Sequence, residues 1–240
     1  MNKLIALLTI ILCCNLPISA QESEEMPLGM TMPIDSLLND WKTRTNLIYD
    51  TDCTNSAVIP QFSDSIYIDR LQRMPTIMEM PYNAIVREYI DRYAVKLRNQ
   101  VSVMLAANNF YMPLFEEALD AYDLPLELKY LPIIESALKP TARSRAGALG
   151  LWQFMLKTGR LYGLESNSLV DDRLDPIKAT WAAARYLREM YDIYQDWHLV
   201  IAAYNCGPGN VNKAIRRAGG ATDYWIIYNY LPRETRGYVP

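Results

Sequence analysis

Glu135 is an acidic residue with apolar neighbours, in the stretch that runs from Leu124 to Phe154. Apolar side chains precede and follow it at helical spacing, namely Leu128, Leu131, Ile134 and Leu138, and Trp152 and Phe154 lie further along. A carboxyl among apolar neighbours keeps its proton to a higher pH than a solvated one, because burial disfavours the charged form. We therefore expect a raised pKa for Glu135 and a capacity to act as a general acid near neutral pH.

Prolines and glycines mark irregular backbone on both sides of this carboxyl. Pro125 suits the first turn of a helix, because its missing N–H would be unpaired there anyway. Pro132 removes an intrahelical hydrogen bond and clashes with the carbonyl four residues earlier, which predicts a kink or a broken turn just before Glu135. Gly147 and Gly150 permit a close approach of backbone to a ligand, so this segment could line a groove beside Glu135.

Four short motifs occur in a fixed order along the chain. They are Glu135-Ser136, the segment GALGLWQF at 147–154, Ala203-Tyr204-Asn205, and ETRGY at 234–238. In order and spacing they resemble the lytic transglycosylases of the soluble-lytic-transglycosylase superfamily, which is related to goose-type lysozyme. A lone glutamate on an amphipathic helix would more simply be a surface residue, but four ordered motifs favour a functional interpretation. The resemblance extends from about residue 62 to residue 240 and implies an all-α, lysozyme-like helical domain with an N-terminal extension.

The resemblance also implies an activity. Enzymes of this family cleave the β-1,4 bond between N-acetylmuramic acid and N-acetylglucosamine in peptidoglycan without water. The residue at the position of Glu135 protonates the leaving oxygen, and then takes the proton of the C6 hydroxyl to leave a 1,6-anhydro end. A route assisted by the N-acetyl group of the substrate needs no second carboxyl. No cofactor is implied; the expected partners are glycan strands and other cell-wall enzymes.

Five further residues match family positions that line the saccharide groove. They are Ser144, Gln153, Tyr204, Asn205 and Tyr238, which the resemblance assigns to substrate binding. Each also has a structural alternative, since Tyr204 suits a core position and Asn205 suits a helix cap. Lys139, Arg143 and Arg145 are candidates for contacts with acidic stem peptides, although a solvated surface is the simpler expectation for them.

Several classes of site are excluded by composition. His198 is the single histidine, so the sequence lacks the residues for most Ser-His-Asp, Cys-His and zinc sites, and we expect no metal. Two alternatives to a lytic transglycosylase stay open. One is a goose-type lysozyme-like hydrolase that uses water, and the other is a non-catalytic module that binds peptidoglycan.

The first twenty residues have the pattern of a secretory signal peptide. A basic Lys3 precedes an apolar run from Leu4 to Cys14, and small residues end at Ala20, where we expect cleavage. Cys13 and Cys14 raise the alternative of a lipoprotein, but neither follows the small residue that lipid attachment normally requires. With the family resemblance, this predicts an exported protein in the periplasm or at the outer membrane of a Gram-negative bacterium. Membrane association stays open as an alternative, but no good lipoprotein signal supports it.

Charge divides the remaining chain into two parts. Residues 21–80 contain four basic and ten acidic side chains, and we interpret them as an acidic, partly irregular leader. Residues 81–240 contain nineteen basic and seventeen acidic side chains and form the expected catalytic domain. Such a balance argues against nucleic-acid binding, which needs a concentrated basic face. Cys53 and Cys206 remain after signal cleavage, and we expect two unpaired thiols.

Periodicity and capping residues predict the helices of this domain. We expect helices over 83–107, 113–121, from a cap at Asp123 through Glu135, beyond Gln153 to Leu161, from Asp175-Pro176 for about five turns, 199–204, and 211–218 with Asn210 as its cap. An aromatic cluster at 223–230 either stacks on sugar rings or closes the domain.

Overall fold

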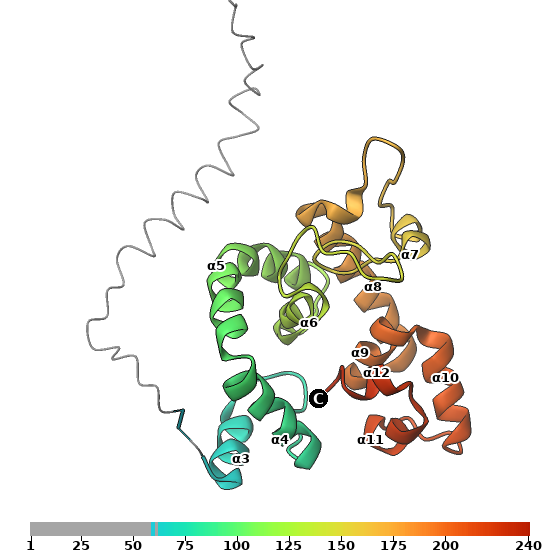
Figure 1. The fold of residues 1–240 in the computed structure, drawn as a ribbon. Coiled ribbons are helices and arrows are strands. Elements are labelled where there is room, and N and C mark those ends of the chain that lie inside the picture. Colours follow the sequence, from blue (N-terminus) through green and yellow to red (C-terminus); the bar gives the residue numbers. More distant parts are fainter. Residues whose placement is uncertain (1–58, 61) are drawn as a thin grey trace, which may run out of the picture. The chain divides into compact units, whose positions relative to one another are not determined.

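The computed structural model of the protein describes residues 59–60 and 62–240, which belong to one compact unit (Figure 1). This part of the chain consists of helices and loops, and its only β-structure is a few isolated bridges. The predicted all-α fold is therefore confirmed. The predicted signal peptide, most of the acidic leader and Cys53 lie outside the described residues. No helix in the described ranges is long and apolar enough to cross a membrane.

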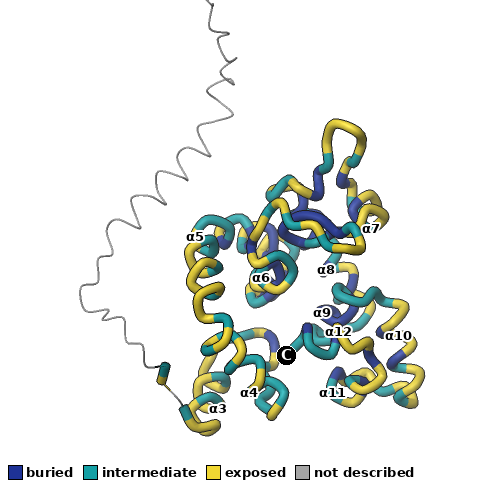
Figure 2. The backbone as a smooth tube through the Cα atoms, viewed as in Figure 1, coloured by how far each residue is buried: buried dark blue, intermediate teal, exposed yellow. Residues whose placement is uncertain are grey.

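The first helices form an arm with few buried side chains, drawn largely in teal and yellow in Figure 2. It comprises α3 (Asp64–Arg73), α4 (Ala84–Asp91), a π-helical turn (Arg92–Lys96) and the start of α5 (Arg98–Asp120). α5 buries only Met112, Phe115, Ala118 and Leu119, all in its second half. The prediction that a separate helix begins at Pro113 is wrong, because Pro113 lies inside α5. Packing of the side chains around it offsets the hydrogen bond that proline removes.

Three consecutive helices supply much of the core. α8 (Pro176–Tyr194) begins as predicted, with the Asp175 carboxylate accepting from the N–H groups of Ile177 and Lys178. α9 (Trp197–Cys206) is buried over five consecutive residues, 199–203. α10 (Pro208–Arg217) begins three residues earlier than predicted. Its N-cap is Gly207, whose φ of 81° favours glycine, and Asn210 lies within the helix.

The C-terminal part closes the domain. It contains α11 (Tyr224–Ile227), a 3₁₀ turn (Tyr228–Tyr230) and α12 (Arg233–Arg236). Tyr224 is fully buried and packs edge-on against Trp225 and Tyr228, so this part of the aromatic cluster closes the domain. His198 lies next to the 59–83 segment, with its Nε2 atom 3.1 Å from the carbonyl oxygen of Glu79.

The segment that contains Glu135 is broken as the sequence predicted. A 3₁₀ turn (Leu126–Tyr130) leads into α6 (Leu131–Ser136), and Pro132 lies in the first turn of α6. Asp123 does not cap this segment, because its backbone is left-handed, with φ 52°. The cap of the 3₁₀ turn is Pro125. Beyond the following loop lie α7 (Leu156–Leu161) and a 3₁₀ turn (Asp172–Leu174), and α7 ends at Leu161 as predicted.

Candidate active site

Glu135 lies in the last turn of α6, and the end of this helix is tied to the loop that follows. Ala137 and Leu138 both have left-handed backbones, so the chain reverses directly after Ser136. The Ser136 hydroxyl lies 2.9 Å from the carbonyl oxygens of both Pro132 and Leu151, between which it shares its proton. This contact fixes the last helical turn, and with it the Glu135 backbone, against the loop.

The loop from residue 139 to residue 155 is anchored from behind by Arg173. This guanidinium is 7% exposed, pairs with Asp171 at 2.6 Å, and donates to the carbonyl oxygens of Gly147 (3.1 Å) and Phe154 (3.2 Å). A side chain on Gly150 would place its Cβ 1.9 Å from the Arg173 carbonyl oxygen, so only glycine fits there. The loop backbone therefore lies directly against the 3₁₀ turn over residues 172–174.

A second anchor joins the loop to α8. The indole nitrogen of Trp152 donates to the Thr180 hydroxyl at 2.9 Å, and both side chains are buried. A buried indole N–H needs such a partner, because an unpaired buried donor is costly. These contacts hold the loop against α8 and the 3₁₀ turn, although it contains no regular element.

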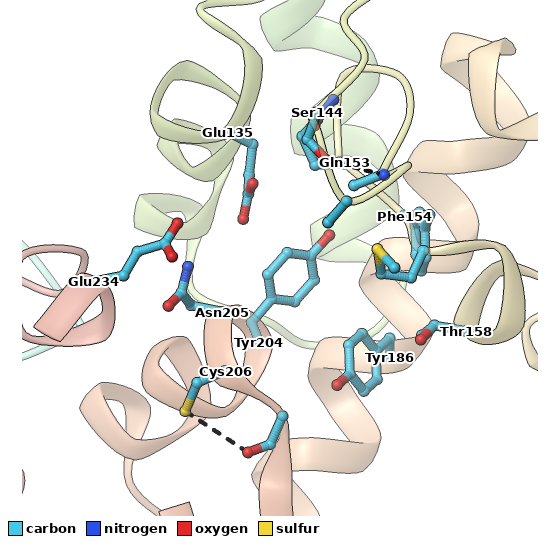
Figure 3. Close-up of a pocket in the computed structure, with 14 residues that line it drawn as sticks. Glu135, Ser144, Gln153, Phe154, Thr158, Tyr186, Tyr204, Asn205, Cys206 and Glu234 are labelled. Carbon is cyan, nitrogen blue, oxygen red and sulfur yellow. Dashed lines mark hydrogen bonds between the residues drawn. The ribbon is translucent and has the colours of Figure 1, made fainter. Parts of the chain in front are cut away.

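Glu135 faces a cavity of about 450 Å³ that we call the active-site pocket (Figure 3). The structure brings five of the six predicted site residues to its wall: Glu135, Ser144, Gln153, Tyr204 and Asn205. The sixth, Tyr238, lies behind Glu135 and lines a neighbouring apolar groove. Its hydroxyl donates a hydrogen bond of 2.5 Å to the Glu135 carboxylate, so Tyr238 contacts the acid directly.

Burial raises the pKa of Glu135 to about 7, the direction predicted from its apolar neighbours. The hydrogen bond from Tyr238 opposes this rise because it favours the carboxylate, whereas the negative charge of Glu234 adds to it. Among the neighbours named from the sequence, Leu131, Leu138, Trp152 and Phe154 are buried, and Ile134 is 44% exposed. A pKa near 7 leaves a large fraction of Glu135 protonated at neutral pH, as a general acid requires.

Both site tyrosines keep their protons. Burial raises the pKa of Tyr204 and of Tyr238 well above the ordinary value, and the nearby Glu135 raises it further. The Tyr204 hydroxyl donates to the carbonyl oxygen of Trp152 at 2.8 Å, which leaves its lone pairs free to accept. Its ring lies 5.4 Å from that of Tyr186, which also lines the pocket.

The polar side chains of the pocket already form hydrogen bonds within the protein, which leaves only some of their atoms for a ligand. Gln153 donates both N–H groups to the carbonyls of Ala142 and Gly150, so its amide oxygen is the atom left for a ligand. Ser144 accepts from the N–H of Ala148 at 3.0 Å and can still donate. Asn205 accepts from the Thr235 hydroxyl at 2.8 Å, and Figure 3 shows its amide nitrogen directed toward Glu135 and Glu234.

Several other residues of the pocket wall were not predicted as site residues, among them Glu234, Tyr186 and Cys206. Glu234 belongs to the ETRGY motif, where Tyr238 was singled out instead, and its carboxyl points into the pocket in Figure 3. Tyr186 lies on α8, which was predicted as a helix from its cap at Asp175-Pro176, and no motif marks it as a site residue. Cys206 directly follows Asn205 and carries a free thiol. Adjacency to the motifs is the signal that could have identified Glu234 and Cys206.

Comparisons with known proteins agree with the four motifs. Residues 113–227 match the family described as the Transglycosylase SLT domain. The chain is 39% identical over 170 residues to the "Membrane-bound lytic murein transglycosylase D" of Escherichia coli (strain K12), which covers 68% of this chain and 36% of that protein. It is 32% identical over 111 residues to the "Soluble lytic murein transglycosylase" of the same strain. This match covers 44% of this chain and 17% of that protein. The chain thus spans about a third or less of the length of these relatives.

Among solved structures, the crystal structure of the 70 kDa soluble lytic transglycosylase of Escherichia coli is similar at 26% identity. The match has a TM-score of 0.48 and covers 65% of this chain and 27% of that one.

Proposed function

We propose, from the match of residues 113–227 to the Transglycosylase SLT domain, that this protein is a lytic transglycosylase of the SLT superfamily and that it cleaves the glycan strands of peptidoglycan without water. The bond broken is the β-1,4 link between N-acetylmuramic acid and N-acetylglucosamine, and the product is a 1,6-anhydro-N-acetylmuramic acid end. The observation that carries this proposal is the half-buried carboxyl of Glu135, which has a pKa near 7 and lies at the wall of the active-site pocket.

In the first step, protonated Glu135 donates its proton to the glycosidic oxygen, and the bond from that oxygen to C1 of the muramic acid breaks. The N-acetyl group of the substrate stabilises the sugar cation that forms, so no enzyme nucleophile is needed. Tyr238 keeps its hydrogen bond to Glu135 and stabilises the carboxylate left behind.

In the second step, the Glu135 carboxylate takes the proton of the C6 hydroxyl, and the C6 oxygen bonds to C1. This closes the anhydro ring and returns Glu135 to its protonated state, so protons balance over the cycle. A pKa near 7 suits both steps, because the group must give a proton and then take one at the same pH. We expect the sugars to be bound by four other residues of the pocket wall, namely Tyr204, Asn205, Ser144 and Gln153.

We place this reaction in the bacterial cell envelope, where peptidoglycan lies. The relatives named above are murein transglycosylases, one of them described as membrane-bound and another as soluble. The signal-peptide pattern of residues 1–20 supports export. We further assign residues 21–80 to a leader and residues 81–240 to the catalytic domain.

Digestion of purified sacculi, followed by mass spectrometry of the products, tests the proposal. The wild-type protein should release anhydro-muropeptides, and Glu135→Gln should release at least a thousandfold less, about 4 kcal/mol in barrier. Glu88→Gln is the matched control, because Glu88 is exposed on α4 and does not line the pocket. Products with reducing ends would indicate the hydrolase instead. A wild type that binds sacculi without releasing fragments would indicate the non-catalytic module.

A further inference from the structure

Thr235 is a buried polar residue to which the proposed mechanism assigns no role. It lies in α12, is 0% exposed, and does not itself line the active-site pocket. The preceding residue, Glu234, does line the pocket. Tyr238, about one turn later, donates its backbone N–H to the Thr235 carbonyl oxygen at 3.1 Å. Thr235 therefore lies between the two residues of the ETRGY motif that act on Glu135.

The Thr235 hydroxyl joins α12 to the end of α9. It donates to the side-chain oxygen of Asn205, Oδ1, at 2.8 Å. A buried hydroxyl is costly to leave unpaired, so the folded state favours this bond. Because Thr235 engages the amide oxygen, the NH₂ group of Asn205 points away from α12, and Figure 3 shows it directed toward Glu135 and Glu234.

The orientation of this amide has two physical causes. A hydroxyl can accept as well as donate, so Thr235 alone would permit the amide to bind either way round. The negative charge of Glu234 removes this ambiguity, because it repels an amide oxygen that faces it and attracts an NH₂ group. Thr235 then holds the favoured orientation by donating to the oxygen on the opposite side of Asn205.

The NH₂ group of Asn205 is left for a ligand. It has no hydrogen-bond partner among the described residues, and Asn205 is half-buried at the pocket wall. Two neighbours in this wall present acceptors instead, since the Tyr204 hydroxyl and the Gln153 amide both spend their protons on backbone carbonyls. Hydroxyl and acetamido oxygens of a sugar accept hydrogen bonds, so they need the donors that Asn205 supplies.

We propose that Thr235 is a positioning residue, which acts through Asn205 by holding its NH₂ group toward the sugar bound beside Glu135. This inference rests on the proposed function and adds a residue to it. Thr235 does not touch the substrate. It orients Asn205 before the sugar arrives, which reduces the entropy lost when the sugar binds.

Rates of fragment release at low concentrations of purified sacculi test this inference. Thr235→Val keeps the shape of the side chain without its hydroxyl, so Asn205 should rotate freely and the rate should fall about tenfold. Thr235→Ser keeps the hydroxyl and should restore most of the rate. Thr76→Val is the matched control and should match wild type, because the Thr76 hydroxyl donates to the Met78 carbonyl outside the pocket. Equal losses in Thr235→Val and Thr235→Ser, or no loss in Thr235→Val, would overturn the inference.

A double-mutant cycle separates positioning from packing. Asn205→Ala removes the amide and should lose about tenfold, and adding Thr235→Val should cost nothing more, because no amide is left to orient. A second tenfold loss would show that Thr235 acts by another route, and the inference would be dropped. If Thr235→Val does not fold, Asn205→Asp tests the same point. It keeps the oxygen that Thr235 binds but lacks the NH₂ group, and a wild-type rate in this variant would contradict the inference.

Binding without turnover decides the role of Thr235 if the wild type releases no fragments and the proposed function fails. In a Glu135→Gln background, adding Thr235→Val should weaken cosedimentation with sacculi about fivefold, whereas adding Thr76→Val should not. In that case, equal binding by the variants with and without Thr235→Val would overturn the inference.

Discussion

Two segments meet at Glu135, and they differ in how they are held. The loop of residues 139–155 is fixed by buried contacts of its backbone, through Arg173, Trp152 and the close approach at Gly150. The C-terminal segment of residues 231–240 reaches the site through side chains, by the Tyr238 hydrogen bond and the charge of Glu234. We infer that the loop sets the shape of the pocket, and that the C-terminal segment sets the proton affinity of its acid.

Substitutions in these two segments should therefore affect different properties of the protein. Changes in the loop should lower the free energy of unfolding, because they disturb backbone packing. Changes in the C-terminal segment should move the pH dependence of the reaction and leave stability nearly unchanged. Glu135 itself should respond in both measurements, since it lies where the two segments meet.

Gly150→Ala should have the largest effect. The new Cβ would overlap the Arg173 carbonyl oxygen, and φ at this position is 80°. We expect the free energy of unfolding to fall by about 3 kcal/mol, as measured by urea denaturation. Gly147→Ala is the matched control, with a similar φ of 88° but no atom within 4 Å of its Cβ, and should lose about 1 kcal/mol. Equal losses in the two variants would show that the contact with Arg173 does not hold the loop.

Glu135→Gln should change stability in a pH-dependent way. Burial raises the pKa of Glu135 from 4.5 to about 7, so the folded protein binds more protons than the unfolded chain between these values. The free energy of unfolding of the wild type therefore decreases as pH rises through this window. Relative to wild type, Glu135→Gln should gain about 2 kcal/mol above the window and nothing below it, after allowance for the partial exposure of Glu135.

Urea denaturation at the two ends of this window measures the difference. Glu88→Gln serves as the control, because Glu88 is solvent-exposed and should give no pH-dependent difference from wild type. A gain for Glu135→Gln that is the same at both ends would contradict a raised pKa.

Much of the site was predictable because its residues lie in short motifs. Glu135, Ser144, Gln153, Tyr204 and Asn205 were selected from the sequence, and the structure gathers them in one pocket. Glu234 lies within the ETRGY motif, but nothing in the sequence indicates that its charge acts on Glu135. Its importance comes from folding, which places it near a carboxyl a hundred residues away.

Helix boundaries were less predictable, for identifiable reasons. Pro113 lies inside α5 because Met112 and Phe115 pack on the core on either side of it. Asp123 adopts a left-handed turn and so cannot cap the following segment. The placement of charges was also not predictable, since the charge of residues 81–240 nearly balances as a whole. Only the fold shows that Lys213 and Arg217 line one cavity without an acidic residue.

Tyr238→Phe should move the pH–rate profile toward higher pH. The lost hydrogen bond favours the Glu135 carboxylate, so without it the pKa of Glu135 rises. Activity requires the protonated acid, and the descending limb of kcat/KM should therefore move up by about one pH unit. Tyr228→Phe, within the aromatic cluster, should leave the limb unchanged. Movement of the limb to lower pH would contradict the role assigned to Tyr238.

Glu234→Gln should have the smallest effect, and in the opposite direction. Removing this negative charge lowers the pKa of Glu135, so the descending limb should move down by about 0.3 pH unit. Because Glu234 is exposed, salt screens its charge, and the shift should disappear near 1 M salt. Glu88→Gln should give no shift at either ionic strength. A shift that persists in high salt would mean that Glu234 acts through a direct contact, and the C-terminal segment would then set pocket shape as well as charge.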